Sequence, residues 1–448
     1  MELYAVGVAI LTATLFFMLA STSPIRYSVG FLLLLAPFHL VTVLSITNSV
    51  AMAFAVIAGI LLSGKRLRIP MLGSMLFVLL GYVISISQVD PSLYRLHGIF
   101  LITLTSGFAI FVLAYNLARN ESDPRAVVDL VIVGNILVDA YCLVQLILGP
   151  GNSASILGFE ALTSEANRGE GDPRLGGPFG GAPGIVAEYL ALVTLILVYE
   201  TLHSERSRRK KLWFLIAINV GLIVATGNRG GIVTLVAGLA GFVFLFRKDF
   251  GTMKTMQLVS IAAAILALSS VIVIELTDFN VMFNRLARIG EMKGMIPETR
   301  QVVWPQAWER FKEVPWFGQG PQWTLPHEED GAIYPGHAHF GYPHSLYLYL
   351  LVTVGIFGTT TFAVLFFVLG SKMLRSVRET SVETTYVRGL VRLGPLLLVL
   401  FLLDEIRIEF LRPTFSDYQH VIFGLFGLWL GLGHRVPAAG RSTGRLNN

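Results

Sequence analysis

Residues 97–117 read HGIFLITLTSGFAIFVLAYNL and contain no Asp, Glu, Lys or Arg. A helix of about 20 apolar residues crosses the hydrocarbon core of a bilayer. Comparable runs recur along the 448 residues, of which 54% are hydrophobic and only 14% are charged. Soluble domains carry about 25% charged residues, so lipid is the solvent for most of this chain. The alternation typical of transmembrane β-barrels is absent. The sequence predicts an all-α polytopic membrane protein.

We expect 12 or 13 transmembrane helices. The candidate spans are 3–20, 28–46, 49–63, 69–88, 97–117, 126–149, 184–201, 212–226, 231–246, 256–276, 345–370, 390–411 and 419–433. The second and third spans are separated only by residues 47–49 and could form one broken unit. The first 20 residues lack a basic segment and a clear cleavage site, so we interpret them as a span and not as a signal peptide.

Lys and Arg residues in short connections predict the orientation. Basic residues cluster in five connections: 65–68, 203–211, 247–254, 372–378 and the tail from residue 435. Counting through the spans puts all five on one side, which we expect to be cytoplasmic. The formal net charge of +5 follows from these connections, so it indicates no nucleic-acid partner.

This orientation divides the chain into transmembrane segments, two long outward loops and a tail. The six segments are N-terminal transmembrane helices (1–149), a first outward loop (150–184), central transmembrane helices with the Arg229 hairpin (185–276), a large outward loop (277–344), C-terminal transmembrane helices (345–433) and a cytoplasmic tail (434–448). We expect the large loop to be partly helical. Val303, Ala307 and Phe311 are four residues apart, as on one face of an amphipathic helix over 299–313. Pro315 and the following glycines are expected to end that helix.

Two glycine-rich segments carry an arginine at the outward end of a span. Arg229 lies in the turn TGNRGG (226–231), and Arg174 lies in GDPRLGGPFGG (171–181). An arginine this close to hydrocarbon is costly unless it binds an anion or has a function, and glycines let a ligand approach the backbone. Arg229 could instead extend to a lipid phosphate, and Arg174 could be incidental to a flexible turn. Glu188 follows within the next span and is expected to face the bundle interior.

Histidines are concentrated in the large loop, at His327, His337, His339 and His344. His344 stands at the mouth of the span 345–370, where an imidazole can take a proton from a hydroxyl group near neutral pH. A helix-capping role is the alternative. His337 and His339, with a third histidine, could bind a metal, although one H-x-H pair is a weak indication.

A further charged cluster stands at the outward end of the span 390–411. It contains Asp404, Glu405, Arg407, Glu409 and Arg412. The alternating signs favour mutual pairing and a structural role, with acceptor binding left open.

In their order and spacing, these segments resemble the O-antigen ligase and O-antigen polymerase family of bacterial envelope glycosyltransferases. The resemblance covers about residues 170–370. It rests on four pieces: Arg-x-Gly-Gly-x-Phe at 174–179, Thr-Gly-x-Arg-Gly-Gly at 226–231, Arg300…Trp304…Pro315-Trp316-Phe317-Gly318-x-Gly320, and the run from His344 to Gly358. The family usually has Asn where this chain has Ser345, and an Asn-Pro-Asn-like run where this chain has 180–184.

The resemblance implies a fold like that of C-type glycosyltransferases and a site on the periplasmic face of the bacterial inner membrane. It implies transfer of a glycan from undecaprenyl diphosphate to a lipid-linked sugar, which is lipid A core for ligases and a lipid-linked oligosaccharide for polymerases. The implied transfer is metal-independent, with no cofactor. The expected partners are therefore the donor, the acceptor and the bilayer.

The expected catalytic residues are His344, Arg229 and Arg300. Arginine binds phosphate oxygens in bidentate fashion, so Arg174, Arg229 and Arg300 are assigned to the diphosphate, and His344 to the acceptor hydroxyl. The expected substrate-binding set also includes Arg288, Glu188 and His339.

Two other classes of function are considered. A secondary transporter would place polar groups in broken helices near the membrane midplane, often with repeats. In this chain the polar residues gather in the outward loops, and no repeat is visible. A non-catalytic envelope scaffold stays open, because only turnover would exclude it.

Overall fold

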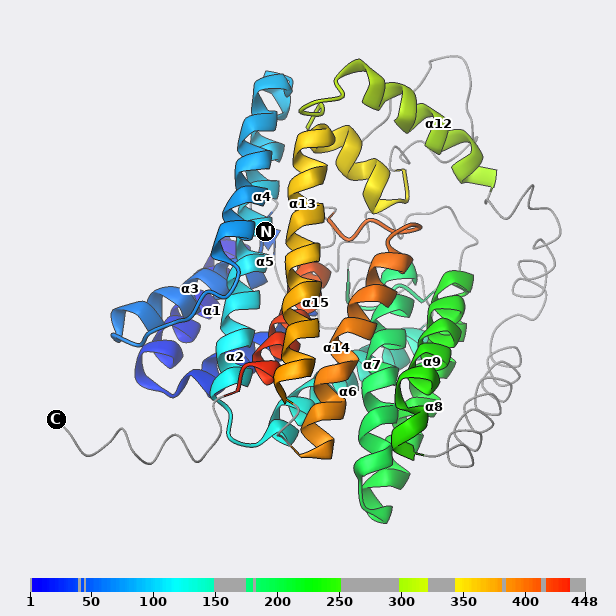
Figure 1. Ribbon diagram of the computed structural model, residues 1–448. Coiled ribbons are helices and arrows are strands. Elements are labelled where there is room, and N and C mark those ends of the chain that lie inside the picture. The colour runs from blue at the N-terminus through cyan, green and yellow to red at the C-terminus, as the bar shows by residue number, and fades with distance from the viewer. Residues whose placement is uncertain are drawn as a thin grey trace.

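The computed structural model describes residues 2–38, 42–43, 46–148, 175–179, 183–250, 298–320, 343–380, 384–411 and 416–435. These residues form a bundle of helices (Figure 1). The helices are α1 (Glu2–Thr22), α2 (Ile25–Leu35), α3 (Asn48–Leu62), α4 (Leu72–Ser85), α5 (Tyr94–Asn120), α6 (Pro124–Leu148), α7 (Pro183–His203), α8 (Arg206–Ala225), α9 (Arg229–Phe250), α12 (Glu298–Glu313), α13 (Leu346–Glu379), α14 (Thr385–Asp404) and α15 (Ser416–Gly433). Two short 3-10 helices (Ile86–Gln88 and Pro91–Leu93) precede α5, and β1 (Thr42–Val43) pairs antiparallel with β2 (Ile46–Thr47) before α3.

The protein is an all-α polytopic membrane protein, as the sequence predicted. Within the described ranges, α5, α6, α7, α9, α13 and α14 are long and apolar enough to cross a membrane, and α1 to α4 contain shorter apolar helices. Each predicted span that falls in those ranges overlaps a helix. The predicted span 256–276 lies outside the described residues.

Two predicted spans are too long at their C-terminal ends. The span predicted over 28–46 ends as a helix at Leu35. Ala36 keeps a helical conformation (φ −53°, ψ −34°), but Pro37 after it has no backbone N–H with which to continue the helix. The span predicted over 390–411 ends at Asp404. Residues 405–411 leave the helix although they include Ile406, Ile408 and Phe410, and this apolar content misled the prediction.

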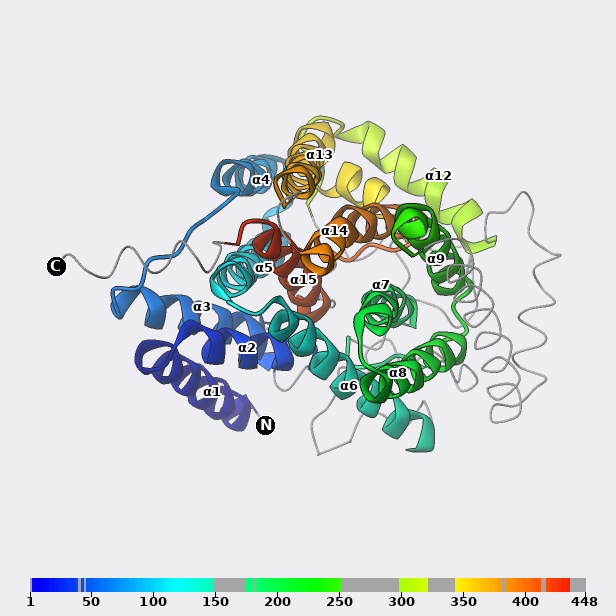
Figure 2. The ribbon, with the colours of Figure 1, turned by 60° about the horizontal axis from the view of Figure 1, so that its bottom comes forward.

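Close helix packing defines the centre of the bundle. α7 is buried along nearly its whole length, and Figure 2 shows it enclosed by α6, α8, α9 and α14. α5 and α15 approach each other closely because α15 presents glycines there. A Cβ added to Gly427 or Gly431 would lie 2.4 or 2.5 Å from a backbone oxygen of α5. Small residues at helix contacts are the usual means of close packing in membranes.

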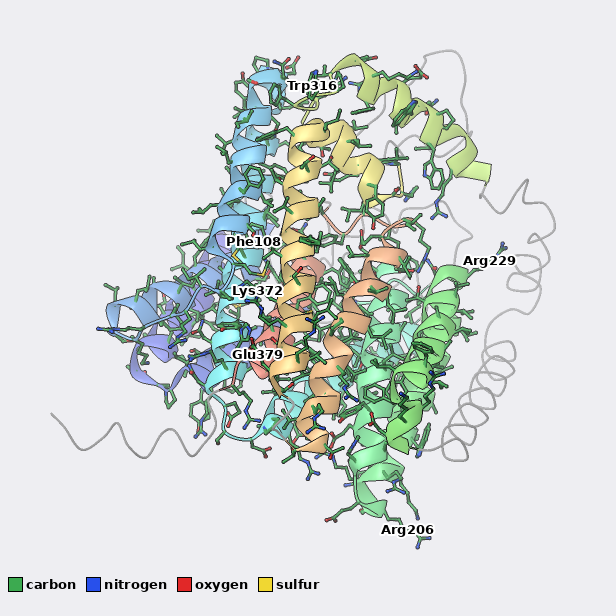
Figure 3. The ribbon with its side chains drawn as sticks, viewed as in Figure 1. Phe108, Arg206, Arg229, Trp316, Lys372 and Glu379 are labelled. Carbon is green, nitrogen blue, oxygen red and sulfur yellow. The ribbon has the colours of Figure 1, made fainter. Side chains whose placement is uncertain are left out.

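The two ends of the bundle carry different segments of the chain. Figure 3 shows Arg229 at one end and Arg206 at the other, and α12 and Trp316 lie at the end that carries Arg229. We call this the site end. The predicted outward turn at 226–231 and the predicted amphipathic helix thus share one end, and the basic connection at 203–211 lies at the opposite end. Which end faces the periplasm stays a prediction.

Candidate functional site

Helix α12 lies across the site end as an amphipathic helix. Its buried face consists of Val303, Ala307 and Phe311, and the last two pack with Val352 of α13. Trp308 on its other face is exposed. The prediction of an amphipathic helix with this buried face is confirmed, and the helix ends at Glu313, just before Pro315.

The turn that follows α12 is bonded into a break in α13. Gly355 has φ 66° and ψ −169°, a region open essentially to glycine alone. The break is closed by four backbone hydrogen bonds to the turn: Gln319 N to Val352 O (2.8 Å), Gly320 N to Thr353 O (2.9 Å), Ile356 N to Pro315 O (2.8 Å) and Phe357 N to Trp316 O (3.1 Å). We call residues 315–320 and 352–357 the glycine lock. It fixes α12 against α13.

The glycine lock also gives a structural reason for two of the four segments on which the family resemblance rests, namely 300–320 and 344–358. A Cβ on Gly318 would lie 2.5 Å from the backbone of Thr353 and Val354, and a Cβ on Gly355 would lie 2.5 Å from the backbone of Trp316 and Phe317. The glycines of the two pieces therefore face each other. The break bends the first turns of α13 under α12 (Figure 1).

His344 is held in a strained backbone conformation just before α13. Its φ of 48° is the only positive value at a non-glycine position in the described ranges. Trp304 Nε1 of α12 donates a hydrogen bond to Pro343 O (2.7 Å) on one side of it. On the other side, Leu346 N donates to Glu405 O and Ile408 O (2.9 Å each). Such strain persists only where surrounding contacts enforce it, and it is concentrated at functional sites.

Residues 405–411, which we call the platform, bring the site residues together. Arg300 of α12 donates from Nη2 to Arg407 O (2.8 Å). His344 Nδ1 lies 3.8 Å from Oε1 of the buried Glu409. The platform thus contacts both Arg300 and His344, two residues that the sequence had assigned to catalysis.

Arg407 connects the platform to the turn at 226–231. Its Nε and Nη2 donate to the two carboxylate oxygens of Asp404 (2.6 Å each), and its Nη1 donates to Asn228 Oδ1 (2.6 Å). The same Asn228 oxygen accepts from Gly231 N (3.1 Å) at the start of α9. Thr234 of α9 also donates to Asp404. The predicted mutual pairing in the 404–412 cluster is therefore present for Asp404 and Arg407.

Arg229 is the first residue of α9 and is half-buried. Its neighbours Asn228 and Gly231 hold its backbone next to the platform through Arg407. Figure 3 shows its side chain extending outward from the site end of α9. The turn, α12 and the start of α13 are therefore brought to one end of the bundle.

The charges around Arg300 are densely packed. Burial lowers the pKa of the Arg300 guanidinium from its ordinary value, and the charge of Arg407 lowers it further, whereas Glu409 and Asp404 raise it. Arginine stays protonated near neutral pH. A partly desolvated cation beside a second cation would be stabilised by an anionic ligand.

Glu188 faces the bundle interior, as the sequence predicted. It is fully buried in the first turns of α7, and its Oε2 accepts a hydrogen bond from the Tyr418 hydroxyl (2.6 Å). Its Oε1 has no hydrogen-bond partner among the described residues. Its part in substrate binding stays a prediction.

Several predicted residues lie outside the described residues: Arg174, Arg288, His339, His327, His337 and Arg412. The segment just after Arg174 is described. Leu175 and Phe179 are buried, and Gly177 N donates to Gln145 Oε1 of α6 (2.8 Å).

Arg407, Asn228 and Glu409 were not among the residues that the sequence assigned to the site. Arg407 and Glu409 stood in the charged cluster that we expected to be structural, and Asn228 stood beside Arg229. The alternating charges after Asp404 were the available signal, because several ionised groups at the end of a span need partners.

The fold and the site define a polytopic membrane protein with arginines, a strained histidine and buried carboxylates gathered at one end of the bundle. The family model described as O-antigen ligase matches residues 214–363, which include Arg229, Arg300 and His344. This match confirms the resemblance to the O-antigen ligase and polymerase family and indicates a membrane glycosyltransferase-like role in polysaccharide assembly. A comparison with curated proteins found no match.

Proposed function

We propose that the protein transfers a glycan from undecaprenyl diphosphate to a hydroxyl group of a lipid-linked sugar. The observation that carries this proposal is the conformation of His344. The residue is held at a positive φ between Trp304 and the platform, beside the Glu409 carboxylate. The same platform binds Arg300 through Arg407 O. A base and a phosphate-binding cation are thus fixed by one short segment.

Different residues act on the two substrates: His344 acts on the acceptor hydroxyl, and the arginines act on the donor diphosphate. His344 removes the proton from the acceptor hydroxyl, whose oxygen forms a bond to the anomeric carbon of the donor. The bond from that carbon to the diphosphate breaks, and the lipid diphosphate leaves with the electron pair. Arg300 and Arg229 stabilise the charge that develops on it. In-line attack of this kind inverts the anomeric configuration.

The remaining assignments extend the same site. Arg174 and Arg288 would add positive charge for the diphosphate, and Glu188 and His339 would contact the sugars. The cations take the place of a metal ion on the diphosphate, so the transfer is expected to be metal-independent. The site is proposed to face the periplasm of the inner membrane, where a lipid-linked donor and acceptor can meet.

The direct test is transfer by the purified protein in lipid vesicles. The donor is a polyprenyl-diphosphate glycan, and the acceptor is either lipid A core or a second lipid-linked repeat. We expect a glycosylated acceptor with inverted linkage and release of polyprenyl diphosphate, unchanged after treatment with EDTA. Product on lipid A core identifies a ligase, and product on the lipid-linked repeat identifies a polymerase.

Three results would contradict the proposal or a part of it. Donor that crosses the vesicle membrane without any new glycosidic bond would indicate a transporter. Binding of the donor without either transfer or transport, in protein that is correctly inserted, would indicate a scaffold. Activity lost with EDTA and restored by Mg²⁺, Mn²⁺ or Zn²⁺ would refute metal independence.

A further inference from the structure

Glu409 is a buried carboxylate directed at the proposed base. Its side chain is 1% exposed, its Oε1 lies 3.8 Å from His344 Nδ1, and the histidine side chain is 31% exposed. Nδ1 of the imidazole therefore lies within ion-pair distance of a buried carboxyl group while the ring stays accessible. We propose that Glu409 is the positioning residue of His344, which orients the ring and stabilises the imidazolium formed during transfer. This inference rests on the proposed function.

The backbone around Glu409 is fixed on both sides. Phe410 N donates to Glu405 Oε2 (3.1 Å), Arg407 O accepts from Arg300 (2.8 Å), and Ile408 O accepts from Leu346 N (2.9 Å). The last bond ties the residue before Glu409 to the chain two residues after His344. The carboxylate and the imidazole are therefore placed by the same set of backbone contacts.

This arrangement supplies what a histidine base requires. A carboxylate at Nδ1 favours the tautomer with its proton on Nδ1, in which Nε2 is unprotonated and can accept the hydroxyl proton. When the acceptor O–H bond breaks, an N–H bond forms at Nε2 and the ring becomes positively charged. Glu409 then lies within ion-pair distance of that positive charge, and burial strengthens the attraction between the two.

Other charged groups surround the pair from three elements. Arg300 of α12 interacts electrostatically with Glu409, which favours the ionised carboxylate. Glu405 of the platform opposes it as a like charge. Asp404 at the end of α14 is paired with Arg407 (2.6 Å). Glu409 is thus the carboxylate for which the structure shows an ion-pair distance to His344.

The test compares Glu409→Gln with Glu409→Asp in the vesicle transfer assay across a range of pH. Glutamine keeps the shape and removes the charge. We expect turnover to fall by about 10-fold or more, up to the roughly 10⁴-fold loss that follows neutralisation of the carboxylate in a Ser-His-Asp triad, with donor affinity unchanged. The imidazolium also loses its stabilising charge, so the acidic limb of the turnover profile should move to lower pH. Glu409→Asp should keep the acidic limb near its wild-type position.

Glu200→Gln is the matched control. Glu200 is equally buried, accepts from Tyr386 (2.7 Å) and Ser204 (3.1 Å), and lies in the last turn of α7, away from the site end. It should leave the acidic limb in place. In a His344→Ala background, Glu409→Gln should cause no further loss, because its effect passes through the histidine.

A wild-type profile in Glu409→Gln would overturn the inference and leave the proposed function standing. So would an equal loss with and without His344, which would show a structural role. If His344→Ala itself keeps normal turnover, the proposed function fails instead.

Discussion

At Gly230 and Gly231, in the turn at 226–231, neighbouring protein atoms leave no room for a side chain. A Cβ on Gly230 would lie 2.0 Å from Cζ of Arg407, and a Cβ on Gly231 would lie 2.3 Å from Cβ of Ala187. The sequence suggested that these glycines let a ligand approach the backbone. In the structure they admit an arginine and a neighbouring helix, and the turn is thereby fixed to the platform.

The side chain of Arg300 is expected to bind the donor diphosphate, and two substitutions test this. Arg300→Lys keeps a charge but loses the planar fork that binds two phosphate oxygens, and Arg300→Ala loses both. Because a hydrogen bond to a charged group contributes about 1.5–3 kcal/mol, we expect donor affinity to fall roughly 10- to 100-fold in Arg300→Ala, and less in Arg300→Lys. Binding of a polyprenyl-diphosphate glycan to detergent-purified protein measures this.

Lys312→Ala is the control for loss of a cation from α12. Lys312 is 51% exposed and pairs with Glu309 (2.7 Å), so its removal should leave donor affinity unchanged. If Arg300→Ala binds donor normally but unfolds at lower temperature, the bond from Arg300 to Arg407 O is structural and the assignment to the diphosphate is wrong.

Helices could be predicted where one buried face repeats apolar residues at helical spacing. The points at which the chain leaves a helix were harder to predict. The spacing of Val303, Ala307 and Phe311 predicted α12 because one face packs on α13. The glycine lock could not be predicted, because its bonds join residues more than thirty positions apart. The platform could not be predicted either, because its contacts also join residues that are far apart in the sequence. Ile406, Ile408 and Phe410 look like a continued span, and only the tertiary contacts of 405–411 show that the helix has ended.

The glycine lock is expected to depend on its two glycines, Gly318 and Gly355. Gly355→Ala and Gly318→Ala place a Cβ against backbone atoms at 2.5 Å and impose a positive φ on a residue with a side chain. The backbone strain alone costs about 1–3 kcal/mol. We expect each variant to melt at lower temperature and to lose transfer activity, because α12 and its Arg300 are no longer fixed against α13.

Gly221→Ala in α8 is the matched control, since no atom lies within 4 Å of its added Cβ. Alanine favours helix more than glycine does, so thermal stability should be unchanged or slightly higher. Normal activity and normal melting in Gly355→Ala would show that the break in α13 does not depend on glycine.

A labelling experiment on the intact protein can determine which end of the bundle faces the periplasm. Cys142 is the single cysteine and is buried in α6, so Cys142→Ala provides a cysteine-free background. Single cysteines are then introduced at Glu309 on α12 and at Ser207 on α8, both exposed. The basic connections predict that 203–211 is cytoplasmic.

In intact spheroplasts, an impermeant maleimide should label Glu309→Cys, and it should label Ser207→Cys only after the membrane is permeabilised. Both variants must insert at normal levels, and the cysteine-free protein must stay unlabelled. The reverse pattern would show that the site end faces the cytoplasm, and the periplasmic placement of the site would be wrong.

We propose that His344 acts on the acceptor while arginines hold the donor, and the variant His344→Ala is the sharpest test of this division. Donor affinity and transfer rate are measured on the same purified variant, after normal insertion has been shown. General-base catalysis contributes roughly 10²- to 10⁴-fold, so turnover should fall by that factor while donor affinity stays at the wild-type value. Arg229→Ala should instead lose both. Near-normal turnover in His344→Ala would show that His344 is not the base.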